Sequence, residues 1–206
     1  MRLTVTTFLS LDGVYQCPGA PNEDGTGYEY GGWTAPYGDE SSGKFITSNF
    51  ANAEAFLLGR KTYEIFAHYW PRVTDPGNPI AAPLNNLPKY VVTSTLASLD
   101  WNNSTPVAGD LAEEIGKLKA RPGNELQVHG SGQLVQALIA GGLVDELRLM
   151  IFPVILGTGK QLFPRAPVAA AMRLADSQTT GTGVTMLTLR PDGPARFGTV
   201  ESDVTA

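Results

Sequence analysis

Residues 55–64 read Ala-Phe-Leu-Leu-Gly-Arg-Lys-Thr-Tyr-Glu, and they pass from a strand pattern to a helix pattern at a single glycine. The apolar residues before Gly59 are typical of a short buried strand that ends at a turn. The next residues, 60–67, place Tyr63 and Phe66 on one side of a short helix. A buried strand that leads through a glycine into a helix is the repeating unit of α/β folds.

The same alternation of strands and helices extends on both sides of this unit. Strands are predicted at 2–9, 55–58, 90–93, 125–129 and 146–152, and helices at 41–53, 60–67, 110–120 and 132–140. Two further strands, 168–176 and 183–190, follow each other without a helix and should pair antiparallel. This order predicts one α/β domain over residues 1–190, with a mainly parallel central sheet, flanking helices and an antiparallel C-terminal edge. A polar tail is expected at 191–206.

Two long segments show neither pattern. Residues 12–40 hold seven glycines and five aromatic residues, which are Tyr15, Tyr28, Tyr30, Trp33 and Tyr37. Loops longer than about 12–15 residues are usually functional or disordered, and we interpret this one as a functional lid. Five prolines between residues 71 and 88 predict a second loop.

Composition excludes several classes of protein. Of the 206 residues, 42% are hydrophobic and 17% charged, which is typical of a globular chain. The lone Cys17 cannot form an internal disulfide, and together with two His it leaves little to bind zinc, so no metal site is expected. A net charge of −5 argues against general nucleic-acid binding. No apolar run reaches the ~20 residues of a membrane span, and the N-terminal segment does not resemble a secretory signal, so we expect a cytoplasmic protein.

Three predicted strand ends carry glycines, hydroxyls or cations. They are Gly59-Arg60-Lys61-Thr62, Thr93-Ser94 and His129-Gly130-Ser131-Gly132. Parallel sheets bind ligands where strands end and helices begin, glycine lets the backbone approach an oxygen closely, and the first N–H groups of a helix attract anions. Together the three ends suit a phosphorylated nucleotide. Taken singly, each is explained as well by a turn or a solvated pair of charges, and neither a full G-x-G-x-x-G nor a P-loop motif is present.

Several stretches resemble a known family. Residues 57–64 are similar to the strand-to-helix motif of dihydrofolate reductases. Ser-Leu-Asp-Gly at 10–13 and Val-Asp-Glu-Leu-Arg-Leu-Met-Ile-Phe-Pro-Val-Ile-Leu-Gly-Thr-Gly-Lys-Gln-Leu-Phe at 144–163 resemble more closely the reductase domain of the bifunctional riboflavin-biosynthesis deaminase-reductase and its stand-alone relatives. The resemblance extends over about residues 2–190 and implies a dihydrofolate reductase-like fold, without the zinc signature of the deaminase.

The resemblance implies that the three strand ends hold a cofactor. The residues that inherit this role are Gly59, Arg60, Lys61, Thr62, Thr93, Ser94, Gly130, Ser131, Gly132, Gln133 and Leu134. The first four would hold phosphates, and the two cations favour NADPH over NADH. Thr93 and Ser94, at the end of strand 90–93, would flank the adenosine half of the cofactor. The glycine turn at 130–132 would cradle the pyrophosphate. His129 stands where relatives often have glycine, and a packed strand-end residue is its more common role.

Candidates for binding the substrate are Asp12, Trp33 and Tyr37, and the candidates for a catalytic residue are Asp12 and Asp39. Asp12 could hydrogen-bond a ring or ribose hydroxyl, or simply belong to an Asp-Gly turn. Asp39 is explained by capping of the following helix. Trp33 and Tyr37 could stack on a flat heterocycle or anchor the loop. The predicted helix 41–53 has no Asp or Glu, whereas folate-reducing relatives carry a carboxylate there, which counts against true dihydrofolate reductase activity.

These observations predict an NADPH-dependent reductase acting on a small heterocyclic, pterin- or pyrimidine-like, or carbonyl substrate. The cofactor supplies the hydride and the protein supplies orientation. A non-catalytic nucleotide- or pterin-binding protein of the same fold is the alternative, and a structural homo-oligomer with vestigial pockets is a third possibility. Because stand-alone relatives often pair, a homodimer is expected.

Overall fold

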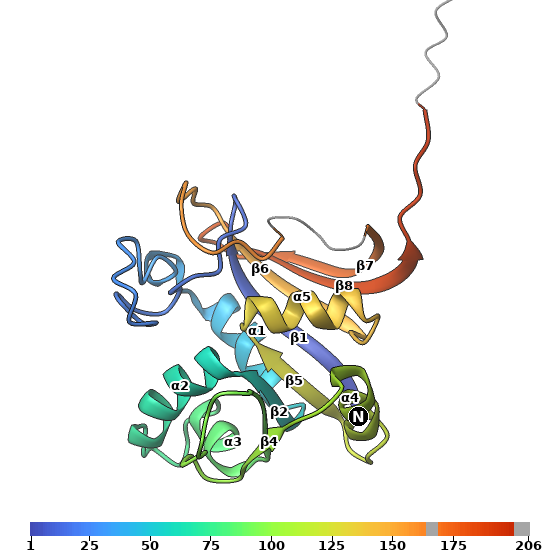
Figure 1. Cartoon of the computed structure of the whole chain (residues 1–206). Helices are drawn as coiled ribbons and strands as arrows, with labels where there is room; N and C mark the ends of the chain where they lie inside the picture. Colours follow the sequence, from blue (N-terminus) through green and yellow to red (C-terminus); the bar gives the residue numbers. More distant parts are fainter. Residues whose placement is uncertain (164–168, 200–206) are drawn as a thin grey trace, which may run out of the picture.

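The computed structural model describes residues 1–163 and 169–199, and its centre is one eight-stranded sheet (Figure 1). The strands are β1 (Arg2–Ser10), β2 (Ala53–Gly59), β3 (Lys89–Val92), β4 (Ser104–Val107), β5 (Glu125–His129), β6 (Glu146–Phe152), β7 (Ala170–Thr179) and β8 (Thr185–Pro194). Their order across the sheet is β4-β3-β2-β5-β1-β6-β8-β7. The strands from β4 to β6 pair in parallel, whereas β8 and β7 pair antiparallel at one edge. The predicted fold class, a single α/β domain with this edge, is confirmed.

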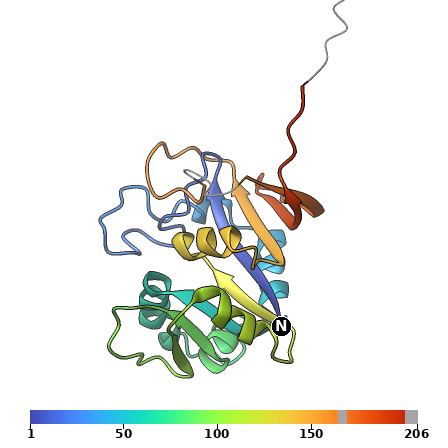
Figure 2. The same ribbon diagram turned by 45° about the vertical axis from the view of Figure 1, so that its right-hand side comes forward.

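Helices cover both faces of the sheet. They are α1 (Glu40–Phe50), α2 (Arg60–Tyr69), α3 (Ala81–Asn86), α4 (Leu111–Lys119) and α5 (Gly132–Ala140), with short 3-10 turns η1 (Ala35–Tyr37) and η2 (Trp70–Arg72). Side chains of α4 and α5 pack on one face with Leu57, Leu126 and Val128. Side chains of α1, α2 and α3 pack on the other face with Phe56 and Leu58. Figures 1 and 2 show α5 in front of the sheet and α1 behind it.

The central strand β5 presents an apolar row to one face of the sheet and a polar row to the other. All its residues are buried. Leu126 and Val128 belong to the core under α4 and α5. Because successive side chains of a strand point to opposite faces, Glu125, Gln127 and His129 lie on the side of α1. The polar row therefore runs beneath α1 up to the strand end.

The structure corrects three predictions. The loop expected at 71–88 is wrong in part, because α3 forms inside it, and Pro83 lies in the first turn, where a helix needs no N–H donor. The sequence pattern gave no strand at 104–107, yet β4 forms there at the sheet edge, where Pro106 is tolerated. The last strand runs on to Pro194, into the segment expected to be a tail.

The remaining predicted elements are confirmed with small shifts of their bounds, and 12–40 is a loop apart from η1 and the first residue of α1. Residue 168 of a predicted strand and residues 200–206 of the predicted tail lie outside the described residues. Within the part of the chain that is described, no helix is long and apolar enough to cross a membrane.

Candidate functional site

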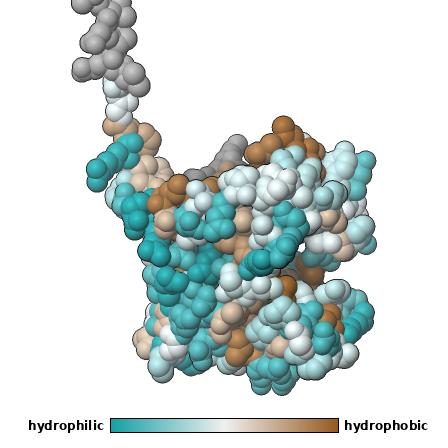
Figure 3. All heavy atoms as spheres, turned by 180° about the vertical axis from the view of Figure 1, so that it is seen from behind, coloured by the Kyte–Doolittle hydropathy of each residue, from teal (hydrophilic) through white to brown (hydrophobic). Residues whose placement is uncertain are grey.

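The carboxyl ends of β3, β2, β5 and β1 lie along one edge of the sheet, because these strands run parallel. The register aligns Gly59 with Val92 and His129 with Thr6. Helices α2 and α5 both begin at this edge. Figure 3, a view from behind, shows a notch between the upper and lower halves of the molecule with apolar residues on its walls, on the side where Figure 1 shows loop 12–40 above α2. The predicted strand-end clusters therefore share one edge that is hollowed.

Ser131 joins the ends of β2 and β5. Its Oγ accepts a hydrogen bond from the backbone N–H of Gly59 at 2.9 Å and donates one to Thr62 Oγ1 at 2.6 Å. A Cβ on Gly59 would lie 2.8 Å from Ser131 Oγ, so only glycine fits. Ser131 itself has a left-handed backbone, with φ of 61°. The starts of α2 and α5 are thus held together by one hydroxyl.

The N-termini of α2 and α5 differ from those of α1 and α4. Asp39 caps α1 and Asp110 caps α4 with side-chain carboxylates. The corresponding N-cap residues of α2 and α5 are Gly59 and Ser131, and neither makes a side-chain cap hydrogen bond. The first N–H groups of these two helices are therefore left for another acceptor, and helix N-termini of this kind favour anions.

Cations and hydroxyls flank the two helix starts. Arg60 and Lys61 both pair with Glu64, at 3.0 and 3.2 Å, and their side chains are 45% and 56% exposed. Thr93 Oγ1 accepts hydrogen bonds from two backbone N–H groups of the turn after β3, while Ser94 is exposed. The structure thus places these residues around one sheet edge, and their contact with a cofactor stays a prediction.

The glycine turn after β5 packs against a residue of the long loop. A Cβ on Gly132 would clash with the Cζ atom of Tyr15, so the phenol ring packs directly on the Cα atom of this glycine. Burial raises the pKa of this tyrosine. Gln133 is exposed beside the turn, whereas Leu134 is buried in the core under α5. No local sequence pattern places Tyr15 in the site, because the contact joins distant segments.

Asp12 connects β1 to the loop after β6. Its carboxylate accepts hydrogen bonds from the Ser10 hydroxyl at 2.6 Å and from the backbone N–H groups of Leu156 and Gly157 at 3.2 and 2.8 Å. The Ser10 hydroxyl does most to hold the pKa of this carboxyl below its ordinary value. The observed contacts of Asp12 are those of a loop-bracing residue.

The remaining candidate residues, Asp39, Trp33 and Tyr37, also make contacts within the chain. Asp39 forms a capping box with Ser42, whose backbone N–H lowers the pKa of the aspartate. Trp33 is buried, donates its indole N–H to the carbonyl of Gln16 at 2.8 Å and packs edge-on against Phe152. The ring of Tyr37 packs against the same phenylalanine. These contacts anchor the loop, and stacking of either aromatic ring on a substrate remains a prediction.

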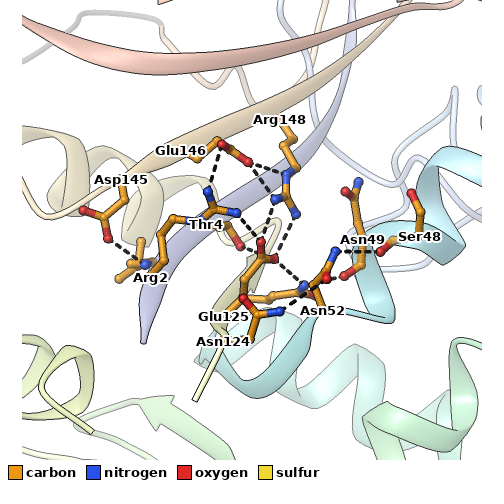
Figure 4. A network of polar contacts seen from close by, with 12 residues as sticks. Arg2, Thr4, Ser48, Asn49, Asn52, Asn124, Glu125, Asp145, Glu146 and Arg148 are labelled. Carbon is orange, nitrogen blue, oxygen red and sulfur yellow. Dashed lines mark hydrogen bonds and ion pairs between the residues drawn. The ribbon is translucent and has the colours of Figure 1, made fainter. Parts of the chain in front are cut away.

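A buried ionic network extends along the polar row beneath α1 (Figure 4). Arg148 lies 2.7 Å from Glu125 and 2.6 Å from Glu146, and all three side chains are buried. Arg2 adds a second cation 2.6 Å from Glu125. Burial alone would raise the pKa of Glu125, but hydrogen bonds from Arg148 and Arg2 hold it below its ordinary value. The network connects β1, β5 and β6 on the face of the sheet that α1 covers.

At the upper end of this row, His129 lies between aromatic rings. It stacks on Phe50 with ring centroids 4.5 Å apart and an interplanar angle of 10°, and its Nε2 lies 3.0 Å from Gln127 Oε1. Burial lowers the pKa of His129 to about 4. The described residues hold no group of three or more His, Cys, Asp and Glu that could bind a metal ion.

The comparison with family models matches residues 2–186 to the RibD C-terminal domain. The chain belongs to this family. Two similar proteins come from Bacillus subtilis (strain 168), and both are described as uncharacterized. YyaP is 31% identical over 142 residues, which are 68% of this chain and 75% of YyaP. YwjB is 25% identical over 135 residues, which are 66% of this chain and 72% of YwjB.

Solved structures support the same fold. A protein described as a riboflavin biosynthesis protein from Shewanella sp. PV-4 superposes with a TM-score of 0.71 at 21% identity, over 93% of this chain and 99% of that one. A pyrimidine reductase-like protein from Corynebacterium diphtheriae NCTC gives a TM-score of 0.59 at 14% identity, over 92% and 91%. The resemblance seen in the sequence is confirmed, and membership of the RibD C-terminal domain family supports a reductase-type function.

Proposed function

We propose that this RibD C-terminal domain protein is an NADPH-dependent reductase that transfers a hydride to a small heterocyclic, pterin- or pyrimidine-like, or carbonyl substrate. One observation carries the proposal. Two helices that begin at the same sheet edge have no side chain capping their N-termini, and Ser131 holds these two starts together. The neighbouring helices α1 and α4 are capped by their own aspartates. NADPH carries phosphate at two separate positions, the pyrophosphate and the 2′-phosphate, and this edge has two helix starts that favour anions.

The residues at the edge fit such a cofactor. The first N–H groups of α5, from Gly132 and Gln133, would hold the pyrophosphate, because a helix N-terminus favours negative charge. Arg60 and Lys61, half-exposed at the start of α2, would hold a 2′-phosphate. Ser131, which holds both starts together, would line the cofactor site with the glycines on either side of it. When bound, the dinucleotide supplies the hydride.

Calorimetric titration with NADPH and NADH tests this proposal. We expect the wild-type protein to bind NADPH more tightly than NADH. Replacing Arg60 and Lys61 together with glutamine should weaken NADPH binding at least tenfold and leave NADH binding nearly unchanged, since a hydrogen bond to a charged group contributes about 1.5–3 kcal/mol. The matched control is Lys117→Gln, which removes an exposed lysine that pairs with glutamates on α4. Absence of binding at millimolar NADPH would contradict the proposal.

A non-catalytic nucleotide- or pterin-binding protein is the second candidate function. The carboxylates of α1 favour this candidate. The helix has one, Glu40, at its exposed first position, so no carboxylate further along α1 can donate a proton to a substrate. This alternative predicts that NADPH binds but is not oxidised with any pterin, pyrimidine, flavin-precursor or quinone substrate. Oxidation of NADPH with one of these substrates would exclude it.

We also propose a homodimer. Large apolar side chains are exposed near the C-terminal strands, at Phe163 (44%), Leu174 (53%) and Phe197 (87%). Exposed apolar groups that gather on one region are typical of a protein interface. Light scattering should give twice the mass of the chain, and a monomer would contradict this expectation. The cytoplasmic location stays a prediction.

A further inference from the structure

A cavity of about 1080 Å³ lies on the face of the sheet that α2 and α3 cover. These two helices contribute Ala67 and Ala82 to its lining, and segment 96–102, in the connection between β3 and β4, contributes Leu96 and Ala97. Figure 1 shows α2, α3 and β4 together in the lower part of the molecule. None of the residues predicted to hold the cofactor is among the described residues that line this cavity. The cavity is therefore separate from the strand-end edge, and it is large enough for a small ligand.

Two buried aromatic residues, Tyr63 and Trp101, form the inner wall of the cavity. The backbone N–H of Trp101 donates a hydrogen bond to Tyr63 Oη at 3.0 Å, and its indole N–H donates one to Asn85 Oδ1 at 3.0 Å. The Asn85 amide in turn donates to the carbonyl oxygen of Trp70 at 3.0 Å. The wall is thus fixed by hydrogen bonds within the chain, so a ligand would not have to order it.

The charged groups that line the cavity are carboxylates. Asp75 and Asp100 come from two different segments, 73–76 and 96–102, and both are exposed. Asp75 accepts a hydrogen bond from the backbone N–H of Gly77 at 2.9 Å, but within the part of the chain that is described neither aspartate forms an ion pair. No lysine or arginine is among the described residues of the lining. The lining is therefore complementary to a cation.

Two cations near the cavity have partners of their own. Lys89 is fully buried behind the inner wall, with its Nζ atom 4.5 Å from the centroid of the Trp101 ring. This ammonium donates to two carbonyl oxygens at the C-terminal end of α3, at 2.7 and 2.8 Å, and their partial negative charge offsets it. Arg72 Nη1 lies 3.1 Å from His68 Nε2, and because a guanidinium can only donate, His68 is the acceptor and adds no positive charge. Neither Lys89 nor Arg72 lines the cavity.

We propose that this cavity is a second binding site and that it takes a small organic cation in which an apolar ring carries an amine. The ring would pack on the aromatic wall and the alanine side chains, and the ammonium would pair with Asp75 and Asp100. Because both carboxylates are exposed, each ion pair contributes little, and most of the affinity would come from buried apolar surface. The inference goes beyond the proposed reductase function and uses none of the residues of the cofactor site.

NMR titration of the ¹⁵N-labelled full chain with benzylamine tests the proposal. The chain has three tryptophans, and a Trp101→Phe variant identifies the indole N–H resonance of Trp101. Benzylamine at up to about 10 mM should shift this resonance and bind about fivefold more tightly than benzyl alcohol, which has the same ring but no charge. Methylamine, which has the charge but no ring, should cause no shift.

Two double variants test the role of the carboxylates. Asp75→Asn with Asp100→Asn should remove the preference for benzylamine over benzyl alcohol. The matched control, Asp176→Asn with Asp192→Asn, makes the same change of charge on exposed residues of β7 and β8, at the opposite edge of the sheet, and should keep the preference. Saturating NADPH should leave the affinity for benzylamine unchanged, because the two sites share no residue.

Several results would overturn the proposal. They are the absence of a shift at the Trp101 indole with benzylamine, equal affinities of the wild-type protein for benzylamine and benzyl alcohol, and the same preference in both double variants. Competition between benzylamine and NADPH would place the cavity in the cofactor site and would also overturn it. If NADPH does not bind but benzylamine behaves as expected, the proposed reductase function fails and the second site stands.

Discussion

Arg148 lies between two buried carboxylates, and replacing it with methionine tests whether the ionic network beneath α1 holds the sheet together. The guanidinium contacts Glu125 at 2.7 Å and Glu146 at 2.6 Å, and these two carboxylates are only 1% and 3% exposed. Methionine keeps much of the apolar stem but removes the charge. Both carboxylates would then remain buried without their shared partner.

The expected loss of stability follows from this burial. Removing one member of a buried ion pair typically costs about 3–5 kcal/mol, out of a total stability of about 5–15 kcal/mol. Arg2 still pairs with Glu125, and Arg190 still pairs with Glu146 at 3.1 Å, so we expect the lower value, about 3 kcal/mol. With a denaturant slope of about 2 kcal/mol/M, the urea midpoint should fall by about 1.5 M.

The control and the pH dependence make the test specific. Lys117→Met removes an exposed ion pair and should leave the urea midpoint nearly unchanged. In the wild-type protein the pKa of Glu125 is lower in the folded state than in the unfolded chain, so the ionised carboxylate stabilises the fold. This stabilisation is complete above the pKa of the unfolded chain and is lost as the pH falls through the pKa of the folded state. The deficit of Arg148→Met should therefore shrink in acid. A variant with the same urea midpoint as Lys117→Met would refute this reasoning.

Three further predictions concern single residues of the site. The pKa of His129 is about 4 in the fold against about 6.5 in the unfolded chain, so its protonation destabilises the wild-type protein by about 3 kcal/mol as the pH falls from 6.5 to 4. Urea titrations across this range should show that His129→Phe lacks this loss, and parallel curves would contradict the assignment. Gly132→Ala places a methyl group on the Tyr15 ring and should cost about 1–3 kcal/mol by thermal unfolding. A Tyr15→Ala background should abolish that cost, and persistence of the full cost would show that the contact is not responsible. Asp39→Ala removes the cap of α1 and should lower the urea midpoint, while Glu40→Gln, which leaves the cap in place, should keep the midpoint nearly unchanged. Equal effects of the two variants would argue against the capping role.

Much of the fold follows from local sequence patterns. Strand and helix periodicity located the parallel strands from β1 to β6 except β4, because each of the predicted ones is an apolar or alternating run that ends at a turn. The four-residue strand β4 escaped detection, since it contains Pro106 and owes its strand conformation to pairing with β3. Helix α3 was not predicted, because proline is typical of a loop unless it is known to lie in the first turn of a helix, as Pro83 does. Tertiary context decided both segments.

The site could be predicted only where its residues follow strand ends. Gly59 and Ser131 stand at such ends, and the parallel order of the sheet brings them together. The contact of Tyr15 with Gly132 joins segments far apart in the sequence, and no local pattern signals it. The burial of His129 against Phe50 and Gln127 depends on the packing of α1, which no local pattern signals.

We propose that the uncapped starts of α2 and α5, joined by Ser131, hold a dinucleotide. A crystal structure of the wild-type protein with NADPH tests it most directly. We predict pyrophosphate oxygens about 3 Å from the backbone nitrogen of Gly132 or Gln133, and the 2′-phosphate beside Arg60 and Lys61. Cofactor density elsewhere on the molecule, with both helix starts left to solvent, would contradict the account.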